Sequence, residues 1–204
     1  MKHPPYAVHP SVRLMVHWVT SLKEKTGRSL EEWVRLVKKE GPGEEEEERQ
    51  DWLRREHGLG TNAAWWIAGR AGGKGGEEDT PEGYLAAAPK YVDAMYDGKR
   101  AGLRAVHDAL IKLARSLGKD VKICPCQTIV PLYRAHVFAQ IKPATNTRID
   151  LGLALKETKA EGRLIDTGGF EKKDRITHRI PITSVEEIDA EVERWLKRAY
   201  GMDA

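Results

Sequence analysis

The feature that most constrains the fold of this chain is a glycine-rich segment before its midpoint. Residues 69–83 read GRAGGKGGEEDTPEG, and six of these fifteen residues are glycine. Glycine loses more backbone freedom on folding than any other residue, and the segment has almost no apolar side chain to bury. We therefore predict a flexible linker at 69–83, between a helical domain at 1–68 and a second domain at 84–204. Five of the six tryptophans precede this linker.

The first predicted domain carries start and stop signals of helices. Ser29 and Glu32 have the spacing of a capping box, and Gly41-Pro42-Gly43 would end the helix that they begin. The acidic run Glu44–Glu48 favours the start of a third helix, because carboxylates stabilise the positive end of the helix dipole. A fourth helix is predicted to begin at Thr61. The domain is therefore expected to be all-helical.

The second predicted domain mixes helix and strand patterns. Leu103–Leu117 has the apolar spacing of an amphipathic helix, and Ser184 with Glu187 forms a second capping box before a closing helix. Between them the period changes to two, which is typical of strands. Four short strands are expected, at Thr128–Tyr133, Ala135–Lys142, Thr147–Leu155 and Arg175–Ile182. This pattern predicts the α+β class, with an antiparallel sheet packed by two helices on one face.

The composition indicates a globular chain outside the membrane. Hydrophobic residues make up 40% and charged residues 32%, and the longest apolar run, Ala63–Ala68, is far shorter than the roughly 20 residues that a bilayer span needs. The start MKHPPYAVHP has no apolar stretch, so we expect no cleaved signal peptide. Two cysteines cannot form a disulfide framework, which favours a reducing cytoplasm.

Several segments resemble known families. EKTGRSLEEWVRLVKKEG (24–41) and DWLRREHGLGTNAAWWIA (51–68) resemble a short helical domain of unknown function that is widespread in bacteria. Four later segments resemble a second domain of unknown function: HVFAQIKPATNTRIDLGL (136–153), RLIDTGGF (163–170), DRITHRIPIT (174–183) and ERWLKRAY (193–200). The resemblance implies a two-domain bacterial cytoplasmic protein without an established activity. Relatives of the second domain also look like parts of restriction-associated and transport-like proteins, which favours nucleic acid as a partner.

The predicted strands place basic side chains on shared faces. Residues 90–180 hold 18 Lys and Arg against 10 Asp and Glu, whereas residues 1–80 hold 13 against 14. If the strands are neighbours, this excess forms a basic sheet face for nucleic acid or an anionic small molecule. Its candidate residues are His136, Lys142, Arg148, Arg175 and Arg179. Phe138 and Gln140 would share the face of His136. The alternative is a solvated surface on which Arg148 pairs with Asp150.

The segment Gly58-Leu59-Gly60-Thr61 resembles the turn of a helix-hairpin-helix motif. Gly58 and Gly60 would let the turn approach a phosphate, towards which the free N–H groups after Thr61 would point. Arg54, Arg55 and His57 would add charge. The alternative is a tight turn whose glycines serve packing only, and the run Glu44–Glu48 would repel a polyanion.

Trp65 and Trp66 are adjacent, so on a helix their side chains point roughly 100° apart. One of them is expected to face outward, where an indole could dock a partner protein or a second copy of the chain. The alternative is that both belong to the core.

An enzyme with an interdomain cleft is a third hypothesis, with Asp150, His136 or His178 as acid–base groups. Cys124-Pro125-Cys126 has no second cysteine pair to complete a zinc site, so two small buried residues are expected there. No catalytic residue, metal or cofactor is assigned from the sequence, and a non-catalytic binding module is the leading hypothesis.

Overall fold

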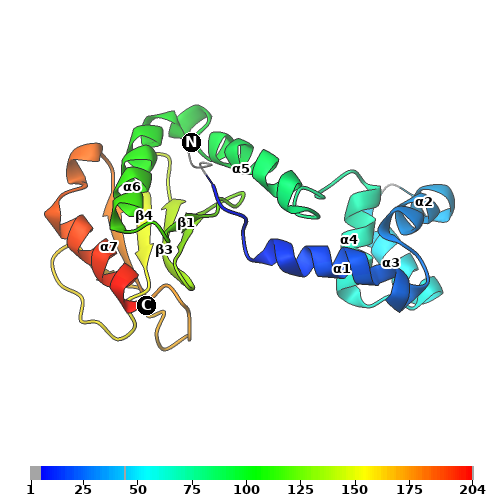
Figure 1. Cartoon of the computed structure of the whole chain (residues 1–204). Coiled ribbons are helices and arrows are strands. Elements are labelled where there is room, and N and C mark those ends of the chain that lie inside the picture. The colour runs from blue at the N-terminus through cyan, green and yellow to red at the C-terminus, as the bar shows by residue number, and fades with distance from the viewer. Residues whose placement is uncertain (1–5, 44, 204) are drawn as a thin grey trace. The chain divides into compact units, whose positions relative to one another are not determined.

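A computed structural model of the chain describes residues 6–43 and 45–203 (Figure 1). The described residues form two compact units. Val8–Ala86 make up a helical unit, and Tyr6, Ala7 and the residues from Ala87 onward make up a sheet unit. In the described ranges, no helix combines the length and the apolar character that crossing a membrane requires.

The helical unit contains four helices that the sequence predicts: α1 (Ser11–Thr26), α2 (Leu30–Glu40), α3 (Glu46–His57) and α4 (Thr61–Ala71). Their apolar faces meet in one core, whose largest buried side chains are Trp33, Leu53 and Ile67. The indole N–H of Trp33 donates to Thr26 Oγ1 at 2.8 Å, so even this buried polar atom has a partner.

The capping box at Ser29 and Glu32 is confirmed. Ser29 Oγ accepts from the backbone N–H of Glu32 at 3.3 Å, and Glu32 Oε2 accepts from the backbone N–H of Ser29 at 2.7 Å. The predicted end of this helix is also confirmed, because α2 stops at Glu40. Of the acidic run, Glu44 lies outside the described residues, and Glu46, Glu47 and Glu48 occupy the first turn of α3.

The glycine-rich segment is enclosed by helices in the structure. Helix α4 continues to Ala71, and α5 (Pro81–Met95) begins before the segment ends. Between them, Arg70 forms a bidentate ion pair with Asp79, with Nη2 2.7 Å from Oδ1 and Nε 3.0 Å from Oδ2. Lys74 Nζ also lies 2.8 Å from Glu46 Oε2. Residues 69–83, predicted as a flexible linker, are thus part of the helical unit, with one ion pair inside the segment and one to α3.

The sheet unit continues with the helical segments η1 (Gly98–Leu103) and α6 (Arg104–Leu117) and ends with η2 (Val185–Glu187) and α7 (Ala190–Met202). Six strands lie between them: β1 (Lys122–Ile123), β2 (Val130–Tyr133), β3 (Val137–Pro143), β4 (Ile149–Leu153), β5 (Ile165–Asp166) and β6 (His178–Ile182). They form one antiparallel sheet in the order β1-β2-β3-β4-β6-β5. The predicted α+β class is confirmed.

Helices α6 and α7 cover one face of this sheet (Figure 1). Alternate residues of β4, namely Ile149, Leu151 and Leu153, are fully buried in the same core as Leu110 of α6 and Leu196 of α7. The residues between them therefore point to the opposite face, as strand alternation requires. That opposite face holds the candidate site.

The prediction of a second capping box at Ser184 and Glu187 is wrong. Ser184 makes no side-chain bond that caps a helix, and Glu187 instead accepts from the backbone N–H of Thr183 at 2.7 Å. Residues 185–187 form only the short segment η2. Helix α7 is capped by Asp189, whose Oδ1 accepts from the backbone N–H groups of Glu191 at 3.0 Å and Val192 at 3.2 Å. Ser184 and Glu187 have the spacing of a capping box, but α7 does not begin there.

Candidate functional site

On the face of the sheet away from α6 and α7, two of the predicted basic residues pair with one carboxylate, and a third lies across from it on the neighbouring strand. Asp150 lies in β4, directly opposite Lys142 of β3 in the strand register. Arg179 of β6 donates from Nη1 to Asp150 Oδ2 at 3.0 Å, and Arg148 Nε lies 2.9 Å from Asp150 Oδ1. We call Lys142, Arg148 and Arg179, with Asp150, the basic face. Three cations around one carboxylate leave two positive charges without a matching negative charge in this group.

The side chains of the basic face differ in their contact with water. Asp150 is the most enclosed, with a side chain 17% exposed, whereas Lys142 is exposed and both arginines are about one-third exposed. The pairing of Arg148 with Asp150, which the sequence offered as the alternative to a binding surface, is present. It does not neutralise the face, because Arg179 shares the same carboxylate.

The other two predicted residues gather around a different carboxylate. His136 precedes β3, and its backbone N–H donates to Asp203 Oδ2 at 2.8 Å, while its Nδ1 lies 3.2 Å from Asp203 Oδ1. Arg175 donates from Nη2 to the same Asp203 and from Nε to the Val137 carbonyl at 2.9 Å. His136 and Lys142 are six positions apart along the chain, which is up to about 20 Å in an extended strand. His136 is therefore not part of the basic face.

Arg175 connects the two groups. It lines a hollow over the sheet together with Lys142, Asp150 and Arg179. The loop before β6 lies against β4 at one side of this hollow, where Ile176 packs on Gly152. A Cβ at position 152 would lie 2.8 Å from Ile176 Cγ2 and from Gln140 Cγ. A glycine at position 152 is thus what lets the loop lie on the strand.

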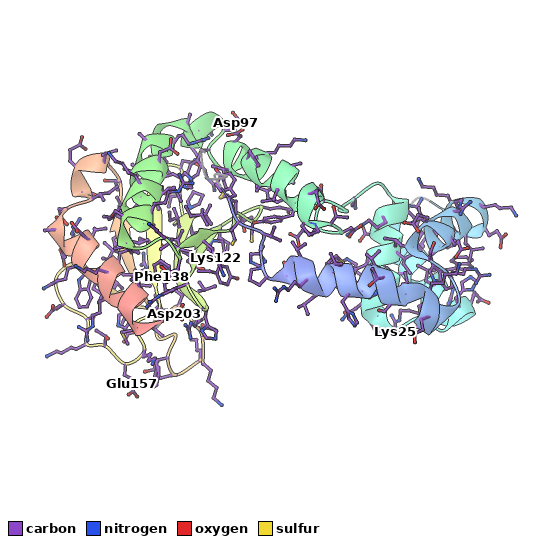
Figure 2. The ribbon with its side chains drawn as sticks, in the orientation of Figure 1. Lys25, Asp97, Lys122, Phe138, Glu157 and Asp203 are labelled. Atoms are coloured by element: carbon purple, nitrogen blue, oxygen red, sulfur yellow. The ribbon has the colours of Figure 1, made fainter. Side chains whose placement is uncertain are left out.

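Phe138 does not lie beside Gln140 and Lys142. A bulge between β2 and β3 shifts the register after Leu132, and Phe138 is fully buried against Tyr200 of α7, with ring centroids 5.6 Å apart. Figure 2 labels Phe138 and also Asp203, the residue that follows α7. The alternation on which the prediction rested is broken by the extra residue of the bulge.

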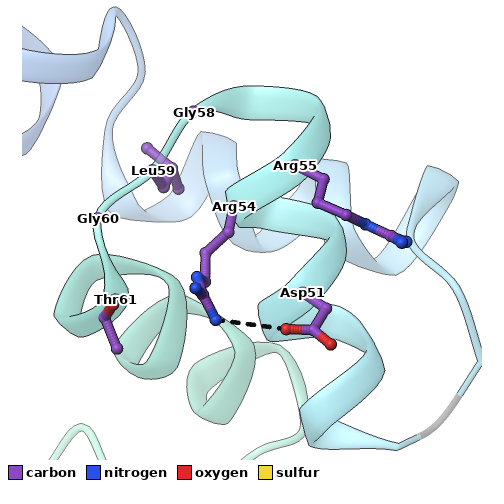
Figure 3. A pocket seen from close by; sticks show the side chains of 7 residues that line it. All are labelled: Asp51, Arg54, Arg55, Gly58, Leu59, Gly60 and Thr61. Atoms are coloured by element: carbon purple, nitrogen blue, oxygen red, sulfur yellow. Dashed lines mark hydrogen bonds and ion pairs between the residues drawn. The ribbon is translucent and has the colours of Figure 1, made fainter.

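The turn between α3 and α4 forms a separate hollow, lined by Asp51, Arg54, Arg55 and Gly58–Thr61 (Figure 3). Gly58 has a φ of +64°, which glycine adopts without strain, and Gly60 precedes the first turn of α4. Arg54 and Arg55 line this hollow, and Asp51 beside them offsets part of their charge. Arg54 Nη1 pairs with Asp51 at 3.4 Å, and Arg55 extends away from Thr61. The His57 ring packs against Trp33 and Trp52.

The adjacent indoles have different surroundings. Trp66 is half-buried and packs edge-on against Trp18, with ring centroids 4.6 Å apart. The Trp65 side chain is 52% exposed on the same helix. One of the two therefore faces outward, and that residue is Trp65.

Of the groups considered for catalysis, the His136 side chain is exposed and Asp150 pairs with arginines on the basic face. His178, like Cys124, is enclosed by structural contacts. His178 is buried, with Nδ1 2.8 Å from Thr177 Oγ1 and Nε2 2.7 Å from the Thr158 carbonyl. A carbonyl oxygen only accepts, so Nε2 carries a proton and donates to Thr158, while Thr177 Oγ1 also accepts from the Leu155 N–H. Cys124 is fully buried, and burial raises the pKa of its thiol to about 12. The side chains of His178 and Cys124 therefore belong to the buried interior of the sheet unit.

Sequence reasoning missed a second hollow in the sheet unit, beside the one over the sheet. Phe170, Lys156 and Lys173 lie on its wall, in the loops that follow β4 and precede β6. The one signal for it was Phe170, an aromatic residue at the end of the RLIDTGGF motif and outside any apolar periodicity.

Fold and site together define an α+β protein with a helical unit and, in the sheet unit, a charged sheet face opposite α6 and α7. Residues 92–203 match the model of a family described as a domain of unknown function (DUF5655). Since this match covers more than half of the chain, the protein belongs to the DUF5655 family. Residues 17–69 match a second domain of unknown function (DUF4287). No curated protein and no solved structure matches the chain.

Proposed function

We propose that this protein is a non-catalytic binding module that holds nucleic acid, or another anionic ligand, on the basic face of its sheet unit. The observation that supports the proposal most directly is the grouping of Lys142, Arg148 and Arg179 around the single carboxylate of Asp150. Guanidinium groups bind phosphate oxygens in a planar, bidentate manner, and Asp150 holds two of them in place before a ligand arrives. An incoming anion meets preoriented donors and an excess of positive charge.

The proposal extends to the cell compartment. We infer a bacterial cytoplasmic protein from the family resemblance of both halves of the chain.

Binding of a fluorescent single-stranded DNA, followed by anisotropy at several salt concentrations, tests the proposal. The Arg148→Gln/Arg179→Gln variant should bind more weakly, and the slope of log K against log salt should flatten by about one for each phosphate that the variant no longer neutralises. Lys112→Gln/Lys197→Gln is the matched control, because it removes the same charge from exposed positions on α6 and α7. Equal effects of the two double variants, or no binding by the unaltered protein, would contradict a site on the basic face.

A second candidate function is docking of another copy of the chain through Trp65. The observation in its favour is the 52% exposure of this indole, since large exposed aromatic side chains are typical of interaction sites. Light scattering should then show a dimer that persists at high salt and becomes a monomer in Trp65→Ala. A monomer at all concentrations of the unaltered protein rejects this function.

A further inference from the structure

The second hollow of the sheet unit continues directly from the basic face. Asp174 and Arg175 line both this hollow and the hollow over the sheet that contains Lys142 and Arg179. A single extended ligand can therefore occupy the two together.

The second hollow has an apolar surface that is open to a flat ligand. Its apolar side chains are Ala154, Met202 and Phe170. Ala154 is buried and Met202 packs against the core, whereas Phe170 is 42% exposed at the tip of the loop. The turn that carries Phe170 is held by backbone bonds from Lys173 N–H to the Phe170 carbonyl at 3.0 Å and from Asp174 N–H to the Gly169 carbonyl at 2.8 Å. An exposed aromatic ring on a hydrogen-bonded turn is a stacking surface.

The backbone around this hollow is unusual. Lys156 has a φ of +53° and Lys173 a φ of +59°, and among the described residues these are the two non-glycine positions with positive φ. Both line the hollow. Such backbone conformations are costly for residues with a Cβ and cluster at ligand sites. Neither lysine forms an ion pair within the described residues, so their ammonium groups are available to a ligand.

The charge of the hollow differs from that of the basic face. Three acidic side chains, from Glu171, Asp174 and Asp203, offset the cations of Lys156, Lys173 and Arg175. A balanced, partly apolar surface suits an uncharged ring with polar edges better than a phosphate. Carboxylates can accept hydrogen bonds from exocyclic amino groups of such a ring.

We propose that this hollow accepts an unpaired nucleobase of a single-stranded nucleic acid whose phosphates lie on the basic face. This inference rests on the proposed function and narrows its ligand to single strands. The base stacks on Phe170 over Ala154 and Met202, and Lys156 and Lys173 contact the flanking phosphates. A duplex cannot bind in this way, because its bases are paired and stacked inside the helix.

The test compares three fluorescent probes of the same length, about 12 nucleotides, which is within the span of one small single-strand-binding domain. The probes are a DNA single strand, the same strand without bases, and the matched duplex. Loss of a base-stacking aromatic weakens binding about tenfold. Phe170→Ala should therefore bind the base-bearing strand about tenfold more weakly and leave binding of the abasic strand unchanged. Phe170→Tyr should retain binding. Val185→Ala, which alters another exposed apolar side chain of similar exposure, is the control.

The outcomes separate the two proposals. If Phe170→Ala binds the base-bearing strand as the unaltered protein does, or if the duplex binds as tightly as the single strand, the nucleobase site is wrong. The basic face then still stands, provided that Arg148→Gln/Arg179→Gln weakens binding. If that double variant has no effect either, both proposals fail. Because Phe170 is exposed, its replacement is expected to leave folding intact, and thermal melting of each variant checks this.

Discussion

Arg175 and Asp203 form an ion pair between the loop before β6 and the residue after α7, with Nη2 of the arginine donating to Oδ1 of the carboxylate. The Asp203 side chain is only 2% exposed. It also accepts the backbone N–H of His136 at 2.8 Å. One buried carboxylate thus joins the end of the last helix, the start of β3 and the loop that carries Phe170.

Replacing Asp203 should destabilise the sheet unit strongly. Asp203 is buried while Arg175 is 46% exposed, so the main cost of replacing Asp203 is the loss of charged hydrogen bonds to Arg175 and to the His136 N–H, about 2 kcal/mol. Asp203→Asn is expected to lower the midpoint of urea unfolding accordingly. Glu157→Gln, a change at an exposed carboxylate in the same unit, should shift the free energy of unfolding by less than about 0.5 kcal/mol. Equal unfolding midpoints for the two variants would show that Asp203 does not join these segments.

His107 should make the sheet unit sensitive to acid. Its ring is 1% exposed and lies 4.8 Å from the ring of Tyr96, and burial lowers the pKa of His107 to about 4 from its ordinary value of 6.5. Above pH 6.5 the imidazole is neutral in both states and stability does not depend on it. As the pH falls from 6.5 towards 4, the unfolded chain binds the proton and the folded chain does not. The free energy of unfolding therefore falls by about 3 kcal/mol over this range.

The variant His107→Leu isolates this contribution from that of the acidic side chains. It keeps an apolar volume in the core and removes both the titrating group and the buried Nδ1, for which the described residues offer no hydrogen-bond partner. Urea unfolding of both proteins at pH 7.5 and pH 4.5 should show a smaller acid loss in the variant. An identical loss in the two proteins contradicts a neutral buried His107.

Local signals in the sequence predicted much of this fold. Ser29 and Glu32 act within one helical turn, so their spacing alone defines the cap. The alternation of β4 likewise placed Ile149 and Leu151 in the core and Asp150 on the other face. The start of α5 was missed, although Thr80 and Pro81 form a helix-start signal in which Thr80 Oγ1 accepts the Gly83 N–H at 3.0 Å. The surrounding glycines obscured it.

The candidate site depends on contacts that local patterns do not contain. That Lys142 lies opposite Asp150 follows from strand register, which a single bulge can change, as at Phe138. The separation of His136 from the basic face has the same origin. The role of Asp203 depends on segments 67 residues apart in the chain. The sequence could therefore name the charged residues but not divide them into two groups.

The cap of α7 offers a direct comparison between the predicted residue and the observed one. Asp189 Oδ1 accepts two backbone N–H groups at the start of the helix, and these bonds lower the pKa of the Asp189 carboxyl. Asp189→Ala leaves the two donors without this partner and should lower the thermal midpoint of the sheet unit by several degrees. Asp189→Ser keeps a capping oxygen and should therefore retain most of the thermal midpoint of the unaltered protein. Ser184→Ala removes no cap and should leave the midpoint nearly unchanged. If Ser184→Ala lowered the midpoint more than Asp189→Ala, the helix would begin at the capping box that the sequence suggests.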